Sequence, residues 1–481
     1  MNALLTLLLA SALPAEAPAK PNIILIMADD LGSGELGCYG QKIIQTPHVD
    51  ALAARGIRFD RWYSGNAVCA PSRCVLMTGK HSGHAVVRNN REIKPEGQFP
   101  MPANTPIIAS LLQGAGYATG AMGKWGLGGP DSTSPPHRMG FDLFYGYNCQ
   151  GHAHNHYPVY LWRNGKKEEI EGNTAGLTGK NYSHDLMEVE ALKFIRGNSS
   201  RPFFLYLPFI IPHLALQVPD DSLAAYKGKF PDPPYPGGKG YLAHPAPRAA
   251  YAAMVTRLDR TVGRINDLLQ ELKIHENTLV VFTSDNGPTH GGVGGSDSDF
   301  FQSAGKLRGL KGSLYEGGIR VPCVAAWPGK IKPATASALP LGHQDFLPTL
   351  AELAGLRIPE DTDGISILPT LLGKGEQKKH EYLYWEFPAY GGQQAAQWGP
   401  WKGVKQKMAQ GVNKLELYNL ESDPGEQNDV AAKHPDMAAK IEKLLKAGHV
   451  PSKDFPLPVV DFDPEKKGLN KMKSDKKKGK E

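Results

Sequence analysis

The feature that most constrains the fold of this chain is the alternation of strand and helix patterns along most of its length. Apolar, β-branched runs typical of buried strands occur at residues 22–28, 117–122, 202–209 and 278–284. Amphipathic helix patterns lie between them, at residues 46–56, 105–116, 183–197 and 248–272. Strands that alternate with helices predict an α/β fold with a large, mostly parallel sheet covered by helices on both faces.

The sequence pattern changes after about residue 375. Short strand patterns follow at residues 381–387, 399–406 and 414–420, and a helix pattern follows at 434–448. We therefore predict an α/β domain over residues 20–374. A smaller α+β domain with an antiparallel sheet is predicted over residues 375–462.

The two ends of the chain are expected to lie outside these domains. Residues 1–19 contain an apolar run and small-residue cleavage sites, which is typical of a secretory signal peptide, although no Lys or Arg precedes the run. A buried first helix is the alternative. The signal-peptide pattern leads us to expect an exported protein, periplasmic or secreted. No other stretch approaches the ~20 apolar residues that span a bilayer, so we expect no transmembrane segment.

Charge is concentrated at the C-terminus. The formal net charge is +6, and residues 464–481 alone hold eight lysines against three acidic residues. We expect the tail over residues 463–481 to be solvated and disordered. The rest of the chain is close to neutral and contains nothing that resembles a nucleic-acid-binding module.

Acidic residues follow two of the predicted strands. Asp29 and Asp30 end one apolar run, and Asp285 and Asn286 end another. Ligands of open α/β sheets bind at the carboxyl ends of the strands, where these side chains would repel each other without a cation. Carboxylate and amide oxygens suit a hard ion, so we predict a Ca²⁺ or Mg²⁺ site. Turn and helix-capping roles are the alternative.

Basic residues and histidines lie in several loops of the predicted domain. Lys124 follows a strand, Lys311 lies in a glycine-rich loop, and His213 lies just past another strand. In the segment GHAHNHYP (151–158), alternation would place the histidines on one side of an extended chain, for zinc or substrate binding or as a solvated loop. None of these residues indicates a function by itself.

One of the five cysteines, Cys69, lies in the segment CAPSRCVLMTG (69–79). A thiol near Arg73 is open to three interpretations: a reactive nucleophile, half of a disulfide, or a small buried residue. The odd number of cysteines leaves at least one thiol without an internal partner.

Together these stretches resemble the type I sulfatases, which are relatives of alkaline phosphatase. The most specific match is the motif C-x-P-S-R…T-G at residues 69–79, in which the family oxidises the cysteine to Cα-formylglycine. The resemblance continues through GKWGLG, SDNG and RGLKGSLYEGGIRVP to LELYNLESDPGEQND near the C-terminus. It implies an alkaline-phosphatase-like sheet and hydrolysis of sulfate esters.

The resemblance also implies roles for individual residues. The Ca²⁺ ligands would be Asp29, Asp30, Asp285 and Asn286, with formylglycine 69 beside them. Arg73 would hold the formylglycine hydrate, while Lys124, His213 and Lys311 would bind the sulfate and assist the leaving group, with His213 or Lys124 as the acid. His154 is a further candidate for substrate contact. One hydroxyl of the hydrate would attack sulfur, and the second would expel sulfate from the covalent intermediate.

One position departs from the family pattern G-K-W-H-L-G, because Gly126 replaces the histidine. In relatives that histidine contacts the hydrate, so we expect compensation from His81, His84 or the 152–156 group, or divergence of a subgroup.

The expected substrate is a sulfated carbohydrate or an aryl sulfate, and the expected maturation partner is a formylglycine-generating enzyme. The alternatives are a phosphoesterase or phosphonate hydrolase of the same superfamily, or a non-catalytic secreted binding protein. The sequence does not identify the sugar. Five aromatic residues are equally suited to stacking on sugar rings and to packing in the core: Tyr157, Tyr160, Trp162, Trp398 and Trp401.

Overall fold

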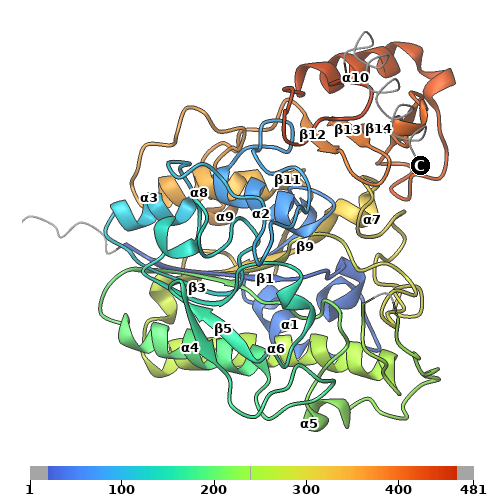
Figure 1. Ribbon diagram of the computed structural model, residues 1–481. Helices are drawn as coiled ribbons and strands as arrows, with labels where there is room; N and C mark the ends of the chain where they lie inside the picture. The colour runs from blue at the N-terminus through green and yellow to red at the C-terminus, as the bar shows by residue number, and fades with distance from the viewer. Residues whose placement is uncertain (1–19, 239, 463–481) are drawn as a thin grey trace, which may run out of the picture.

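The computed structural model describes residues 20–238 and 240–462. The predicted signal peptide and lysine-rich tail therefore lie outside the described residues. Figure 1 shows a large sheet between two layers of helices, with a second, smaller sheet beside it. The prediction of an α/β fold with a small antiparallel sheet is confirmed.

The large sheet has 11 strands in the order β10-β2-β9-β8-β1-β7-β3-β4-β5-β6, with β11 paired to β2. Its centre, from β8 through β1 and β7 to β3 and β4, is parallel, while β9, β5 and β6 each pair antiparallel with their neighbours. The strand bounds are β1 Asn22–Ala28, β2 Ile57–Tyr63, β3 Ala118–Lys124, β4 Leu143–Tyr147, β5 Tyr160–Arg163, β6 Lys166–Glu169, β7 Phe203–Pro208, β8 Thr278–Ser284, β9 Arg320–Ala326, β10 Thr335–Ser337 and β11 Leu341–Gly342.

Helices cover both faces of this sheet, as Figure 1 shows. Successive side chains of a strand point to opposite faces, and β1 accordingly sends Ile24 and Ile26 into one core and Ile23 and Leu25 into the other. The first core packs against α1, α4 and α6, and the second against α2, α3 and α8. The helix bounds are α1 Pro47–Ala54, α2 Cys69–Thr78, α3 Ile108–Gly114, α4 Ser183–Gly197, α5 Asp220–Leu223, α6 Pro247–Glu271, α7 Glu316–Ile319, α8 Phe346–Leu353, α9 Leu368–Leu372 and α10 Pro435–Ala447.

The small sheet is a four-stranded antiparallel meander in the order β12-β13-β14-β15. One face packs against α10 through Ile441 and Leu445, and the other contributes Trp385 and Phe387 to a core shared with Tyr63 of the large sheet. Its strands are β12 Leu383–Phe387, β13 Gln393–Trp398, β14 Trp401–Lys405 and β15 Leu415–Asn419.

Candidate active site

The carboxyl ends of β1 and β8 place four polar side chains together. Asp29 and Asp30 follow β1, and Asp285 and Asn286 follow β8, which is its parallel neighbour in register up to the last residue. All four side chains are fully buried. The Asp30 backbone N–H donates to Asp285 Oδ1 over 3.1 Å, and Asn286 Nδ2 donates to Asp30 Oδ1 over 2.8 Å. The structure thus brings together the residues for which the sequence predicts a metal site.

Helix α2 begins at Cys69 and contains the sequence motif described above. Pro71 lies in its first turn, where a missing N–H breaks no helical hydrogen bond. Asn90 Oδ1 accepts a 2.9 Å hydrogen bond from the free Ala70 N–H. Gly79 ends the helix with a φ of +68°, in the left-handed region that glycine adopts without strain. The motif at residues 69–79 is therefore a single helix that ends at Gly79, and Cys69 is its first residue.

The Cys69 thiol lies beside the carboxylates and one lysine. Its Sγ is 3.6 Å from Asp29 Oδ1 and 3.5 Å from Lys311 Nζ. Burial raises the pKa of the Cys69 thiol to about 12, although Lys124 and Lys311 act in the opposite direction. All five cysteines are free thiols, which removes the disulfide interpretation. The unmodified thiol is therefore protonated near neutral pH, and its nearby cations do not activate it.

Arg73 lies one helical turn after Cys69 and is 1% exposed. Its Nη2 donates to Asp285 Oδ2 over 2.7 Å and to Asp29 Oδ2 over 3.2 Å. Its Nη1 donates to the Lys124 carbonyl oxygen over 2.5 Å. The guanidinium thus joins β1, β8 and the end of β3 beneath Cys69.

Two lysines complete the charge balance of this buried cluster. Lys124 forms an ion pair with Asp29, and Lys311 Nζ lies 2.8 Å from the Asp30 carboxylate. With Arg73 they supply three positive charges for the three carboxylates. The two lysines differ in position: Lys311 lines the cavity above Cys69, and Lys124 does not.

That cavity has a volume of about 250 Å³, and His213 and His154 line it together with Cys69 and Lys311. His213 Nδ1 donates to the Leu214 carbonyl oxygen over 2.6 Å, so in the neutral ring Nε2 carries the lone pair, 3.6 Å from Asp30 Oδ2. Burial, with a contribution from the two lysines, holds the pKa of His213 well below its usual range. The His154 ring stacks on that of His213 at a centroid distance of 5.0 Å and extends the same wall.

The other histidines of residues 151–158 lie elsewhere. Residues His152–His154 form a 3-10 turn, so the expectation of an extended segment with three histidines on one side is wrong. His152 Nδ1 lies 3.3 Å from Glu96, and His156 Nε2 donates to the His213 carbonyl oxygen over 3.0 Å. A turn sends successive side chains in different directions, and of these three histidines only His154 reaches the cavity.

The space beside Gly126 is filled by a residue that sequence reasoning missed. A Cβ at this position would lie 2.8 Å from Gln150 Nε2, and Gln150 lines the cavity. His81 and His84 instead lie beside Asp363, with His84 Nδ1 2.9 Å from its carboxylate, and neither lines the cavity. The geometry places Gln150 next to Gly126, where the sequence suggested a histidine.

A Gly126→His substitution is expected to lower the free energy of unfolding by about 1–2 kcal/mol. Gly126 has a φ of +78°, which disfavours any residue with a Cβ, and the Gln150 amide would have to move. Urea unfolding measures the change. Gly126→Ala isolates the backbone cost, and a Gly126→His/Gln150→Ala variant is expected to be more stable than Gly126→His alone. Equal stability of the two histidine variants would show that Gln150 does not occupy this space.

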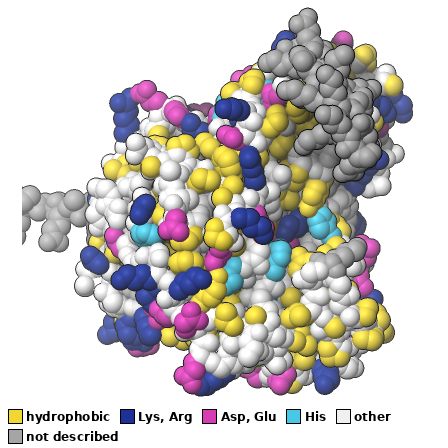
Figure 2. Space-filling model, viewed as in Figure 1, with side chains coloured by type: hydrophobic (Ala, Val, Ile, Leu, Met, Phe, Trp, Pro, Cys, Tyr) yellow, Lys and Arg dark blue, Asp and Glu magenta, His cyan; other side chains and the backbone are white. Residues whose placement is uncertain are grey.

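The cavity also receives residues from loops without any sequence signal. Gln98, Tyr241 and Tyr390 line it, whereas the five aromatic residues singled out by the sequence do not. Of those five, Tyr157 and Trp162 are buried in the large domain, and Trp401 packs near α10. On the face shown in Figure 2, histidine and basic side chains gather below the small sheet.

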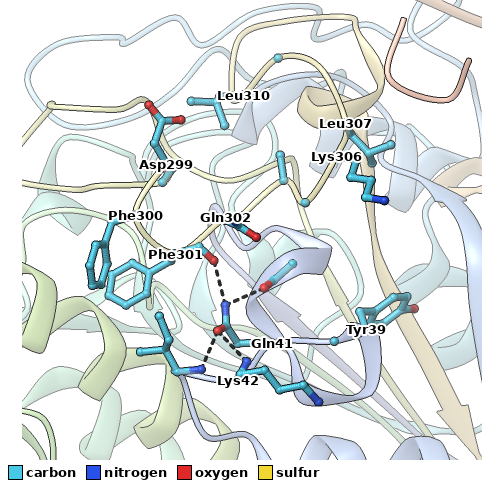
Figure 3. Close-up of a pocket in the computed structure, with 17 residues that line it drawn as sticks. Tyr39, Gln41, Lys42, Asp299, Phe300, Phe301, Gln302, Lys306, Leu307 and Leu310 are labelled. Carbon is cyan, nitrogen blue, oxygen red and sulfur yellow. Dashed lines mark hydrogen bonds between the residues drawn. The ribbon is translucent and has the colours of Figure 1, made fainter. Parts of the chain in front are cut away.

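A larger hollow, of about 810 Å³, lies elsewhere on the large domain. Figure 3 shows its floor, where Gln41 Nε2 donates to the carbonyl oxygens of Gly34 and Phe301, and Gln41 Oε1 accepts from the Lys42 N–H. The amide is fully satisfied, and none of the predicted site residues lines this hollow. Its size alone does not make it the reactive site.

Comparison with known proteins agrees with the geometry. The family model described as Sulfatase matches residues 21–356, and the model described as N-sulphoglucosamine sulphohydrolase, C-terminal, matches residues 310–449. The chain belongs to the sulfatase family. It is therefore a sulfuric ester hydrolase, and the resemblance stated from the sequence is confirmed.

Relatives within the sulfatase family match this chain over most of their length. Human arylsulfatase A is 34% identical over 422 residues, which cover 81% of this chain and 75% of that protein. The N-acetylgalactosamine-6-sulfatase of Canis lupus familiaris is 31% identical over 468 residues, which cover 92% and 83%. The crystal structure of Ps i-CgsB has a TM-score of 0.76 at 29% identity and covers 94% of this chain and 96% of its own. No helix within the described ranges of this sulfatase is long and apolar enough to cross a membrane.

Proposed function

We propose that this sulfatase removes sulfate from a sulfated carbohydrate, with Cys69 as the nucleophile after oxidation to formylglycine. The observation that carries the proposal is the position of Cys69, with Asp29 on one side and Lys311 on the other, at the base of a cavity. A group that attacks sulfur needs a metal to acidify it and a cation to balance the sulfuryl oxygens. Lys311 is the cation beside Cys69, and the neighbouring carboxylates would hold the metal.

The carboxylate cluster fits a hard divalent cation. Asn286 Oδ1 is buried and has no hydrogen-bond partner among the described residues, although its Nδ2 donates to Asp30. A buried acceptor normally has a partner, and Ca²⁺ binds amide and carboxylate oxygens together. We propose that Asp29, Asp30, Asp285 and Asn286 hold Ca²⁺, or Mg²⁺, beside residue 69.

The formylglycine hydrate would supply one hydroxyl to attack sulfur and a second to release sulfate. Other side chains would position the carboxylates, bind the sulfate and protonate the leaving group. Arg73 and Lys124 lie beneath the site and fix the carboxylates. Lys311 and His213 face the cavity and would contact the sulfuryl oxygens, and His154 would contact the leaving group. Of the two residues suggested as the acid, His213 faces the cavity and Lys124 does not, so His213 is the candidate for protonating the departing oxygen, after it has itself taken up a proton.

The carbohydrate class rests on the relatives. N-acetylgalactosamine-6-sulfatases of dog and pig each cover 92% of this chain, against 79% for mouse steryl-sulfatase. A solved structure at 29% identity is a complex of Ps i-CgsB with k-i-k-neocarrahexaose. The pattern of residues 1–19 supports export to the periplasm or the medium, and a host formylglycine-generating enzyme would be required for maturation.

The test is hydrolysis by protein purified from a host that converts the cysteine. We expect turnover of 4-nitrophenyl sulfate and of a sugar sulfate, with far slower turnover of 4-nitrophenyl phosphate and phenylphosphonate. EDTA is expected to lower kcat by about a hundredfold or more, and Ca²⁺ should restore it, because a metal supplies several kcal/mol of charge stabilisation. Preferred turnover of the phosphate or phosphonate ester would replace the sulfatase proposal with the phosphoesterase one.

A further inference from the structure

An exposed tyrosine of the small sheet reaches the cavity that contains Cys69. Tyr390 lies in the loop between β12 and β13, and 62% of its surface is exposed. It lines the cavity together with Cys69 and Lys311, which come from the large domain. A large aromatic side chain left in solvent at the wall of a reactive cavity is available to a ligand.

The backbone at Tyr390 is held in an unfavourable conformation. Its φ is +52°, in the left-handed region that is unfavourable for a residue with a Cβ. The next two residues, Gly391 and Gly392, also have positive φ, and their carbonyl oxygens accept hydrogen bonds of 2.7 Å from the Ala409 N–H and 3.2 Å from the Met408 N–H. The loop therefore fixes the direction of the Tyr390 side chain at an energetic cost.

The ring of Tyr390 packs beside the loop that carries Lys311. A Cβ on Gly312 would lie 2.3 Å from Tyr390 Cε2, so the glycine admits the ring at this position. Phe387 supports the ring at a centroid distance of 5.2 Å, and His290 lies 6.0 Å away. Part of the ring is thus supported by protein, and the rest is free.

We propose that Tyr390 is the platform on which the sugar ring of the substrate lies, next to the sulfate held at Lys311. This inference rests on the proposed function and adds a residue that determines substrate specificity. The C–H face of a sugar ring is apolar and packs on an aromatic face, while its hydroxyls stay hydrated or reach polar neighbours. The phenol hydroxyl adds a hydrogen-bonding group at the edge of the same ring.

The experiment compares two ligands of the same site in the holoenzyme. The first is the best substrate among N-acetylgalactosamine 6-sulfate, galactose 6-sulfate and glucosamine 6-sulfate, and the second is inorganic sulfate as a competitive inhibitor. Tyr390→Ala is expected to lower kcat/KM for the sugar sulfate about tenfold, mainly through KM, and to leave the Ki of sulfate within about twofold. Tyr390→Phe and Tyr390→Trp keep an aromatic face and should retain most of the activity.

A second readout separates binding from folding. Tyr390→Gly removes the strain at positive φ, which offsets part of the packing lost against Phe387, so its melting temperature should fall less than that of Tyr390→Ala while KM rises to a similar extent. The matched control is Val459→Gly, a 42% exposed residue with a φ of +71° outside the cavity, which should change stability similarly and leave the kinetics unchanged.

Three outcomes would overturn the proposal that Tyr390 is the sugar platform. They are an unchanged kcat/KM in Tyr390→Ala, a rise in the Ki of sulfate equal to the rise in KM, or a wild type that cleaves 4-nitrophenyl sulfate but none of the sugar sulfates. In the last case the sulfatase activity stands without the carbohydrate class. A wild type that cleaves no sulfate ester at all would instead remove the proposed function.

Discussion

Cys69→Ala is expected to lower kcat/KM for sulfate-ester hydrolysis by about 10⁴-fold or more, as removal of a catalytic nucleophile does in other hydrolases. Cys69 is 1% exposed and makes its polar contacts with Asp29 and Lys311, so the substitution removes the group on which both neighbours converge. Alanine fits the space, since it is smaller than cysteine, and the helix begins at this residue without a side-chain cap. The loss should therefore come from chemistry and not from unfolding.

The matched control is Cys74→Ala. Cys74 lies on the same helix, is fully buried and packs in the apolar core away from the cavity. We expect its activity to stay within about threefold of the wild type, because a buried cysteine behaves there as a small apolar residue. Cys69→Ser supplies one hydroxyl in place of the two of the proposed hydrate. We therefore expect this variant to release a burst of alcohol without steady turnover.

The mass of the peptide that contains residue 69 completes this test. A peptide lighter than the cysteine form, in wild-type protein from a converting host, would agree with an aldehyde at this position. Residual activity above one-tenth in Cys69→Ala, or full activity of protein in which the thiol is unchanged, would rule out Cys69 as the source of the nucleophile.

The central part of the fold could be predicted from the sequence because local patterns determine it. The strand predicted at residues 278–284 and the helix at 183–197 have the bounds found in the structure. A buried parallel strand is apolar on both faces and is followed by turn residues, so a few consecutive residues are enough to recognise it. The carboxylates that follow β1 and β8 could be placed at one edge for the same reason.

The remainder depends on contacts between distant segments. Strand β9 lies between β2 and β8 and runs antiparallel to both, which no local pattern indicates. Gln150 and Tyr390 reach the cavity from loops whose course is set by the elements around them. Arg73 was assigned through the family motif, but its hydrogen bonds to Asp29 and Asp285 follow only once the helix is docked on the sheet.

Those hydrogen bonds lead to the second large effect. Arg73→Met is expected to lower the free energy of unfolding by about 3–5 kcal/mol, because it leaves buried Asp285 without its counter-charge and Asp29 with Lys124 alone. Both partners, Asp29 and Asp285, are fully buried, and water cannot replace the guanidinium there. Urea unfolding measures the loss. The control is Arg196→Met, which removes an exposed ion pair with Glu271 and should leave stability nearly unchanged.

A double-mutant cycle distinguishes lost charge balance from lost packing. Asp285→Asn should destabilise the wild type, but on the Arg73→Met background it removes an unbalanced charge and should cost much less or restore stability. Ca²⁺ should reduce the cost of Arg73→Met, since a dication bound by the same carboxylates takes over part of the neutralisation. Additive losses that do not respond to Ca²⁺ would mean that Arg73 acts through its packing. A coupled loss that Ca²⁺ reduces would mean that one charge balance maintains both the fold at this sheet edge and the chemistry above it.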